Sequence, residues 1–431
     1  MGFLLRFPMD NKMIVEKNPD ELPGANTKKP AARGSSSSEK SERSSSPQEF
    51  LEEPKATKAD PAKREPSPSE ESDGRPPAPK VVAKRFEVRR KLGSGSYSVV
   101  HLAWDRVAKR HVALKFEWMN AEKTDKLLKE VEICQLFGHE SPRTTSVLWS
   151  GSKGEYNIMA MGLLGPSLED LFMKTCRRKF SLKTVLMLGE QMIDCIEFVH
   201  SFKVIHRDIK PSNFVIGAGE GQDNKVYIVD FGLSKRYRNP ETGKHIPFAK
   251  KGGMTGTARY TTVNLHRGCE PSRRDDLGSI GYVLLYFLRG QLPWQGINHR
   301  DKKRRKKKIG KRKLATSHAE LCKGFPKEFK EYLEYCDGLG FKDKPDYTHL
   351  RGLFRKAAAR RQLDFDWHFD WMTPRQKRKR APDDSQSEEE DYSSYQTDYE
   401  TDEETTSSLS GPKEALTSEQ PKTPKKKKRK R

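Results

Sequence analysis

Residues 204–213 read Val204-Ile-His-Arg-Asp-Ile-Lys-Pro-Ser-Asn213, and the stretch Val229-Asp-Phe-Gly232 follows after a short gap. Asp208 can orient and deprotonate a substrate hydroxyl, and Lys210 can neutralise charge on a phosphoryl group in transfer. Asn213 and Asp230 can hold Mg2+ through their side-chain oxygen atoms. The spacing of these groups predicts transfer of a phosphoryl group from a nucleotide to a hydroxyl.

A glycine-rich turn lies upstream of these residues. Alternating apolar and polar side chains predict antiparallel strands around it, at residues 86–92, 93–101 and 112–115. Gly93 and Gly95 let a backbone approach phosphates closely, and Val100 is placed to cover an adenine ring. Such turns are common between strands, so this feature alone is a weak indication of nucleotide binding.

An ion pair is predicted between Lys115 and Glu130. Lys115 ends the motif Val-Ala-Leu-Lys, and Glu130 lies in the helical stretch 126–136. Such a pair aims the lysine at the α- and β-phosphates of ATP. If the two were instead surface side chains, replacing Lys115 by Met would leave activity intact.

The order of these segments predicts an α+β protein with two lobes. Residues 156–161 are expected to form a strand, residues 162–165 a flexible connection and residues 180–202 a helix. A short buried strand at 225–229 then presents Asp230. The combined motifs predict the bilobal protein kinase fold, with a small β-rich N-lobe and a larger α-helical C-lobe.

Composition predicts one folded core with disordered extensions, because only 33% of the 431 residues are hydrophobic. The expected parts are a Ser/Pro/Lys/Glu-rich extension at 1–85, a kinase domain at 86–372 (N-lobe 86–162, C-lobe 165–372) and a tail at 373–431. No stretch approaches the ~20 apolar residues of a membrane span. The six cysteines are scattered, which suits a reducing compartment. We therefore expect a soluble intracellular monomer.

The formal net charge of +23 is concentrated in three runs. Residues 300–313 carry eleven bases and one acid, residues 375–380 carry five bases, and residues 425–431 carry seven. Three interpretations stay open beside a merely solvated surface: docking of acidic substrates, importin-type binding that brings the protein to the nucleus as well as the cytoplasm, and direct nucleic-acid binding. No aromatic residues interleave the bases, which argues against nucleic acid.

The segment Leu163-Leu-Gly-Pro-Ser-Leu-Glu-Asp-Leu-Phe172 resembles the casein kinase 1 family rather than protein kinases at large. Further segments that resemble this family are 255–260, 273–277, 292–296 and 344–347. The resemblance covers about residues 86–372. It implies a Ser/Thr protein kinase that uses ATP and Mg2+ and needs no phosphorylation of its activation loop. Its substrates would be proteins with Ser or Thr preceded by an acidic or already phosphorylated residue.

The resemblance also assigns an ATP site. Position by position, it implies nucleotide contacts from Leu92, Gly93, Ser94, Gly95, Ser96, Tyr97, Ser98, Val99, Val100, Ala113, Lys115, Glu130, Met159, Met161, Leu164, Val215 and Val229. Met161 would be the gatekeeper, the backbone of Leu164 would bond the adenine base, and Asp276 would brace the catalytic loop. Ser98 replaces a third loop glycine and Gly162 replaces a usual Glu, so we expect an altered ATP affinity rather than its loss.

Two anion sites for the substrate are implied in the same way. The first would consist of Arg259, Lys302 and Arg305, and the second of Arg207 and Lys235. Guanidinium and ammonium groups bind phosphate dianions through charge-assisted hydrogen bonds. Such sites would select acidic or phosphorylated segments.

The acidic tract at 383–404 holds eleven acids and no base. We expect it to bind the basic groove as an autophosphorylated, autoinhibitory pseudosubstrate, and the alternative is a disordered tail that only balances charge. A broader alternative is a kinase fold that docks acidic or nucleic-acid partners without catalysis. An enzyme is favoured because the residues needed for catalysis are intact, namely Lys115, Glu130, Asp208, Lys210, Asn213 and Asp230.

Overall fold

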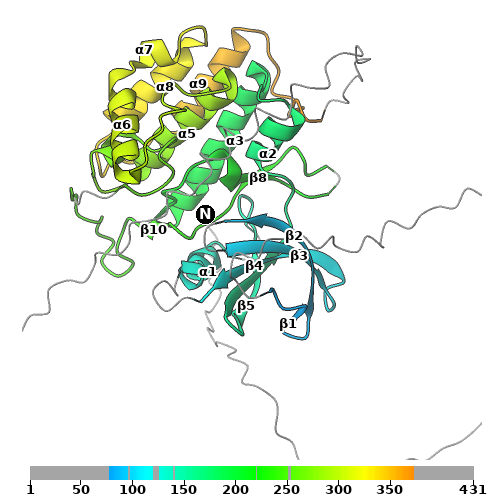
Figure 1. The fold of residues 1–431 in the computed structure, drawn as a ribbon. Helices are drawn as coiled ribbons and strands as arrows, with labels where there is room; N and C mark the ends of the chain where they lie inside the picture. Colours follow the sequence, from blue (N-terminus) through cyan, green and yellow to red (C-terminus); the bar gives the residue numbers. More distant parts are fainter. Residues whose placement is uncertain are drawn as a thin grey trace, which may run out of the picture. The chain divides into compact units, whose positions relative to one another are not determined.

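The computed structural model describes most of the chain between residues 77 and 372 (Figure 1). The described ranges are 77–95, 98–119, 126–138, 141–219, 221–250 and 254–372. Ser96, Tyr97, the extension up to residue 76 and the tail with its acidic and basic tracts lie outside them. The predictions made for these residues are therefore not addressed by the structure.

The N-lobe contains one antiparallel sheet with strand order β1-β2-β3-β4-β6-β5 (Figure 1). Its strands are β1 (Val81–Val82), β2 (Phe86–Ser94), β3 (Ser98–Asp105), β4 (Arg110–Trp118), β5 (Val147–Lys153) and β6 (Tyr156–Gly162). α1 (Lys126–Leu136) packs against β5 and β6. Along β4, Val112, Leu114 and Phe116 enter the buried core of the sheet. Lys115 lies between them in sequence and therefore points to the opposite face.

Two sequence-based boundaries in this lobe are corrected by the structure. The folded region begins before residue 86, because Val82 is fully buried and β1 pairs with β2. Two consecutive valines are too short a run to show alternation, so the sequence does not reveal β1. The strand expected at 93–101 is also shifted, since Gly93 and Ser94 continue β2 and β3 extends to Asp105.

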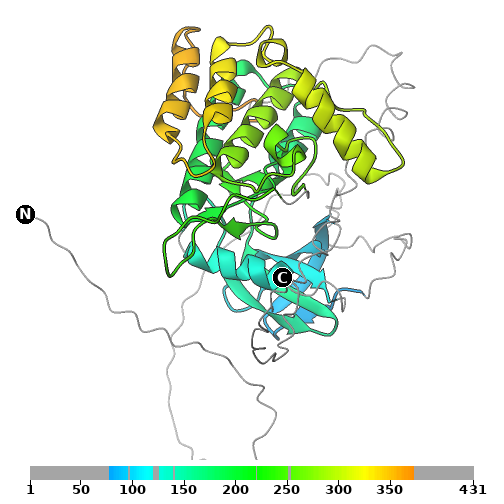
Figure 2. The ribbon, with the colours of Figure 1, turned by 90° about the vertical axis from the view of Figure 1, so that its left-hand side faces the viewer.

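The C-lobe is mainly helical, as predicted. Its helices are α2 (Leu168–Asp170), η1 (Leu171–Thr175), α3 (Leu182–Ser201), η2 (Pro211–Asn213), α4 (Val263–His266), α5 (Arg273–Arg289), α6 (Lys302–Ala315), α7 (His318–Leu321), α8 (Lys327–Gly338) and α9 (Tyr347–Ala359). The helix expected at 180–202 is α3, which begins after the N-cap Ser181. α3 lies side by side with α5 and α9 (Figure 1 and Figure 2). Among the described residues, none of the helices is long and apolar enough to span a bilayer.

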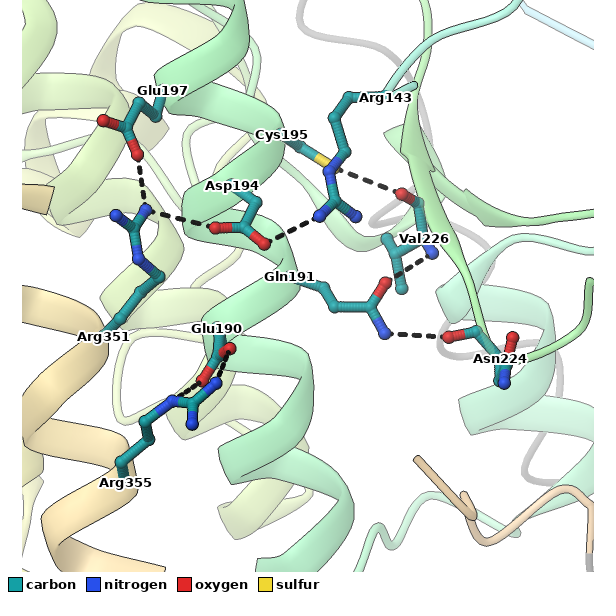
Figure 3. Close-up of polar contacts among 10 residues, drawn as sticks. All are labelled: Arg143, Glu190, Gln191, Asp194, Cys195, Glu197, Asn224, Val226, Arg351 and Arg355. Atoms are coloured by element: carbon teal, nitrogen blue, oxygen red, sulfur yellow. Dashed lines mark hydrogen bonds and ion pairs between the residues drawn. The ribbon is translucent and has the colours of Figure 1, made fainter. Parts of the chain in front are cut away.

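Charged side chains of α3 tie this helix to its neighbours (Figure 3). Arg355 of α9 forms a bidentate ion pair with Glu190, at 2.7 Å from Nε to Oε2 and 2.6 Å from Nη2 to Oε1. Asp194 accepts hydrogen bonds from Arg143, at 2.8 Å, and from Arg351, at 3.1 Å. Arg143 precedes β5, so these charge-assisted bonds connect α3 with α9 and with the chain that enters the N-lobe sheet.

The same helix fixes the backbone before Asp230 (Figure 3). Gln191 Nε2 donates to the Asn224 carbonyl and Gln191 Oε1 accepts from the Val226 N–H, both at 2.8 Å. The thiol of Cys195 donates to the Val226 carbonyl at 3.3 Å. Val226 begins β9 (Val226–Ile228), which pairs with β8 (Phe214–Ile216). α3 therefore positions the strand that leads to a predicted metal ligand.

Candidate active site

The predicted catalytic loop leaves β7 (Val204–Ile205), which pairs with β10 (Lys235–Arg236). Asp276 of α5 holds the backbone of this loop. Its Oδ2 accepts from the His206 N–H at 2.8 Å, and its Oδ1 accepts from the Arg207 N–H at 2.9 Å. Arg207 has a φ of 71°, a conformation that costs energy in a residue with a side chain. The buried carboxylate of Asp276 therefore stabilises a strained turn that carries Asp208.

Two hydrogen bonds and one ion pair orient the carboxylate of Asp208, which is 5% exposed. Oδ1 accepts from the backbone N–H of Thr257 at 2.9 Å and from its hydroxyl at 2.8 Å. Oδ2 lies 2.7 Å from Lys210 Nζ. The sequence predicts Asp208 and Lys210 as a catalytic pair, and the structure brings them together. The structure adds Thr257 as a partner of Asp208. The sequence indicated this residue only as part of segment 255–260, which resembles the casein kinase 1 family.

Lys115 joins two carboxylates in the same region. Its Nζ lies 2.7 Å from Glu130 Oε2 and 2.9 Å from Asp230 Oδ1. Burial alone would lower the pKa of Lys115, but the charges of Asp230 and Glu130 together raise it. Burial raises the pKa of Glu130, with Lys115 opposing that effect. The ion pair expected from the sequence is therefore present, and it includes Asp230 as a third member.

The two predicted metal ligands, Asn213 and Asp230, lie on adjacent backbone segments. The Val229 N–H donates to the Asn213 carbonyl at 2.9 Å, which places the residue before Asp230 against Asn213. Asn213 Nδ2 donates to the Asp208 carbonyl at 2.9 Å, so the amide oxygen is the atom left to serve a cation. Mg2+ commonly takes only one or two protein oxygens and completes its shell with phosphates and water. This donor set fits Mg2+.

Residues predicted to bind the nucleotide in the N-lobe meet across the sheet. In the β3–β4 ladder Val100 pairs with Lys115, and in the β4–β6 ladder Ala113 pairs with Met161. The remaining described members of this set on or next to β2 and β3 are Leu92, Gly93, Ser94, Gly95, which follows β2, Ser98 and Val99. Met159 pairs with Lys115 in the β4–β6 ladder, is 2% exposed and packs with Leu127 and Val131 under α1.

The connection between the lobes offers unpaired backbone groups. Among the described residues, the N–H and C=O of Leu164 have no hydrogen-bond partner. The neighbouring groups are engaged, since the Gly165 N–H donates to the Ile216 carbonyl at 2.9 Å and Thr145 Oγ1 donates to the Gly162 carbonyl at 3.0 Å. Within the described part of the chain the backbone groups of Leu163 also have no partner, so the backbone at Leu163 and at the predicted Leu164 could bond an adenine edge. Val215 and Val229, predicted to line the same site, are half-buried.

The second predicted anion site is engaged within the protein. Arg207 Nε donates to the Leu233 carbonyl at 2.5 Å, and Lys235 Nζ lies 2.6 Å from Glu270 Oε1. Burial lowers the pKa of Arg207, with the charge of Glu270 opposing that effect. In this structure Arg207 therefore binds the segment after Gly232, and Lys235 pairs with Glu270.

Arg259 lies beside residues that the predicted anion site did not include. It lines a hollow of about 230 Å³ whose other residues are Met173, Arg178, Tyr286, Arg289, Gly290, Gln291 and Gln295. Lys302 and Arg305, at the start of α6, are not among these lining residues. Arg178 and Arg289 were missed by sequence reasoning because they are far from Arg259 in sequence and belong to no motif. Three arginines from separate segments therefore line one hollow.

A comparison with protein-family models matches residues 86–344 to the model described as protein kinase domain. The match spans more than half of the 431 residues. It contains the residues whose geometry is described above, from the glycine-rich turn through Asp208 and Asp230 to Asp276.

Proposed function

The chain belongs to the protein kinase family, and on this premise we propose that it is a Ser/Thr kinase of the casein kinase 1 type. It would transfer the γ-phosphate of ATP to hydroxyls in acidic or already phosphorylated segments of proteins. Members of the family use ATP with Mg2+ in general. The observation that carries the proposal is the carboxylate of Asp208, held by Thr257 and Lys210.

In this mechanism Asp208 accepts the hydrogen bond of the substrate hydroxyl and takes its proton as the oxygen attacks the γ-phosphorus of ATP, whose bond to the leaving ADP breaks. Lys210, 2.7 Å from Asp208, neutralises charge on the phosphoryl group in transfer. Lys115 orients the nucleotide phosphates, and Glu130 keeps the lysine in place. Mg2+ held by Asn213 and Asp230 would neutralise charge on the phosphates. Catalysis is then mostly positioning and electrostatic stabilisation.

The choice of Ser or Thr over Tyr is supported by the close approach of the segment around Thr257 to the catalytic loop. An added Cβ at Gly256, whose φ is +88°, would lie 2.4 Å from the Arg207 carbonyl oxygen. A substrate backbone bound along this segment would therefore lie near Asp208, which suits a short side chain. We expect a Ser peptide to be phosphorylated and its Tyr counterpart to stay unmodified, and the reverse result would contradict this specificity.

The preference for acidic substrates is supported by the hollow beside Arg259. Thr257 and Arg259 are two residues apart, so their Cα atoms lie at most ~7 Å apart. With the length of an arginine side chain added, an anion in the hollow would lie on the order of three extended residues from the target hydroxyl. Arg178 and Arg289 add two further positive charges there. An acidic or phosphorylated residue near that position would complement these charges.

Peptide kinetics can test this preference. Two peptides would be compared that differ only in having phosphoserine or alanine three residues before the target serine. Arg178→Ala should raise the KM for the phosphopeptide about tenfold, because a hydrogen bond to a charged group contributes about 1.5–3 kcal/mol. The alanine peptide serves as the matched control and should show no such change. An equal effect on both peptides would argue against an anion site in the hollow.

We also propose that the acidic tract at 383–404 restrains the enzyme. The support is charge complementarity with the exposed bases of α6, which include Lys302, Lys303, Arg304, Lys307 and Lys308. Truncation after Met372 should raise peptide phosphorylation, most strongly at low salt, where such attraction is least screened. Unchanged activity would refute the restraint.

The basic run at 425–431 supports a further proposal, importin-type transport into the nucleus. A reporter protein fused to residues 422–431 should accumulate in the nucleus. A reporter that stays in the cytoplasm would count against this localisation.

A further inference from the structure

One lysine of the basic helix α6 is buried. Most bases of this helix are exposed, including Lys303, Arg304, Lys308 and Arg312, whereas Lys313 is 3% exposed. A buried ammonium group must be paired or hydrogen-bonded, because its transfer from water is otherwise costly. The partners of Lys313 therefore indicate what the residue does.

Lys313 binds the backbone of the segment that contacts Asp208. Its Nζ donates to the carbonyl of Ala258 at 2.8 Å and to the carbonyl of Thr261 at 2.5 Å. The carbonyl between them, that of Arg259, accepts from Trp294 Nε1 at 2.7 Å. Lys313 Nζ also lies 5.0 Å from the ring centroid of Trp294, a favourable distance for a cation–π contact. The ammonium and the indole thus satisfy three carbonyls of one short segment.

The local sequence of α6 allows this close approach. Gly310 lies against His266 of α4, and a Cβ added there would lie 3.0 Å from the His266 side chain. Ile309 is buried one helical turn before Lys313, so the two residues share the inner face of the helix. The glycine lets α6 approach α4 closely enough for Lys313 to reach the segment.

This segment connects two parts of the active site. Thr257 binds the Asp208 carboxylate, and Arg259 borders the arginine-lined hollow. We propose that Lys313 is a positioning residue for phosphoryl transfer, which holds residues 257–262 in the conformation that lets Thr257 orient Asp208. It acts through the backbone and touches neither substrate nor nucleotide. The inference rests on kinase activity and is independent of the proposed preference for acidic substrates.

The test compares variants of the full chain. Lys313→Met removes the ammonium group and keeps most of the side-chain volume. We expect kcat/KM for a peptide to fall about tenfold or more, mainly through kcat, which corresponds to about 1.4 kcal/mol of transition-state stabilisation. The ATP dissociation constant should stay unchanged, and amide hydrogen exchange should increase within residues 257–262. Lys313→Arg, which keeps the charge and the donors, should restore part of the activity.

A matched control is Lys356→Met, which removes an exposed ammonium from α9 and should leave all these values unchanged. The proposal is overturned if Lys313→Met has wild-type kcat/KM, or if it loses ATP binding and activity together. Should this variant fail to fold, Lys313→Gln keeps a donor in the buried site and should show an intermediate fall in kcat. Wild-type kinetics in Lys313→Gln, or failure of both variants to fold, would assign Lys313 no positioning role.

Discussion

Replacement of Lys115 by Met should separate the structural and chemical roles of the Lys115–Glu130–Asp230 cluster. The substitution removes the ammonium group that lies 2.7 Å from Glu130 and 2.9 Å from Asp230. The Glu130 side chain is only 4% exposed, so it loses its counter-charge inside the protein. Asp230 loses the charge of Lys115, the larger cause of its lowered pKa, but it keeps the charge of Lys210 and its side chain is 40% exposed. We therefore expect the cost to fall mainly on Glu130.

The size of this cost depends on pH. Breaking a buried ion pair typically destabilises a protein by about 3–5 kcal/mol. Protonation of Glu130 sets an upper limit on the stability that the variant loses. Protonating a glutamate of ordinary pKa, about 4.3, costs about 3.7 kcal/mol at pH 7 but only about 1 kcal/mol at pH 5. Burial raises the pKa of Glu130, so the folded variant binds the proton more tightly than the unfolded chain. Its stability should therefore fall as pH rises above about 4.3.

The assay combines urea unfolding at pH 5 and pH 7 with peptide phosphorylation. Lys115→Met should be less stable than wild type by about 3 kcal/mol at pH 7 and by about 1 kcal/mol at pH 5. Adding Glu130→Gln should recover most of that stability, because no charge is then buried without a partner. Activity should fall about 100-fold or more in both variants, since the lysine that orients the phosphates is absent from each.

Two results would refute this reasoning. One is equal stability of Lys115→Met and wild type at pH 7, which would mean that Glu130 is solvated without its partner. The other is full activity in either variant, as expected for a surface pair. Lys356→Met is the control for loss of one exposed ammonium and should change the free energy of unfolding by less than about 0.5 kcal/mol.

Three further substitutions probe other parts of the structure. Asp276→Asn should lower kcat about tenfold or more, because one amide cannot accept the hydrogen bonds of both loop N–H groups. In wild type, stability is lost as pH falls through the lowered pKa of Asp276, and the variant should lack this loss. Arg360→Ala should reduce the urea-unfolding free energy by about 3–5 kcal/mol, since it leaves the fully buried Glu328 without its partner, and Glu328→Gln should reverse most of this loss. Gly165→Ala should raise the KM for ATP in steady-state assays, because its Cβ would lie 2.9 Å from the Gly217 carbonyl oxygen and displace the connection that contains Leu164.

Long periodic segments and short-range motifs were accessible from the sequence. The helix expected at 180–202 is α3, and the strand expected at 156–161 is part of β6. The Lys115–Glu130 pair also follows from its motif and forms at 2.7 Å. The helix and the strand follow from the spacing of apolar residues along the chain. The ion pair follows from a motif whose residues bind nucleotide phosphates. In contrast, β1 was missed because two consecutive valines show no alternation, and Val82 is buried through pairing with β2 and packing in the core of the sheet.

Residues joined only by tertiary structure could not be predicted in this way. Arg178 and Arg289 meet Arg259 at the hollow although no motif links them. Lys313 lies in a run of similar bases, so composition assigns it to the solvated face. Helical phase is the one signal that could have distinguished it, since the apolar Ile309 precedes it by four residues and so lies on the same face.

We propose that Asp208 promotes transfer of the ATP γ-phosphate to Ser or Thr in acidic segments. The most direct measurement is incorporation of labelled γ-phosphate into an acidic serine peptide by wild type and by Asp208→Asn, with the matching alanine peptide as control. Wild type should label only the serine peptide, and Asp208→Asn should be slower by about 100- to 10,000-fold, the usual contribution of a general base. Equal incorporation by the two proteins, or none by wild type, would contradict the claim.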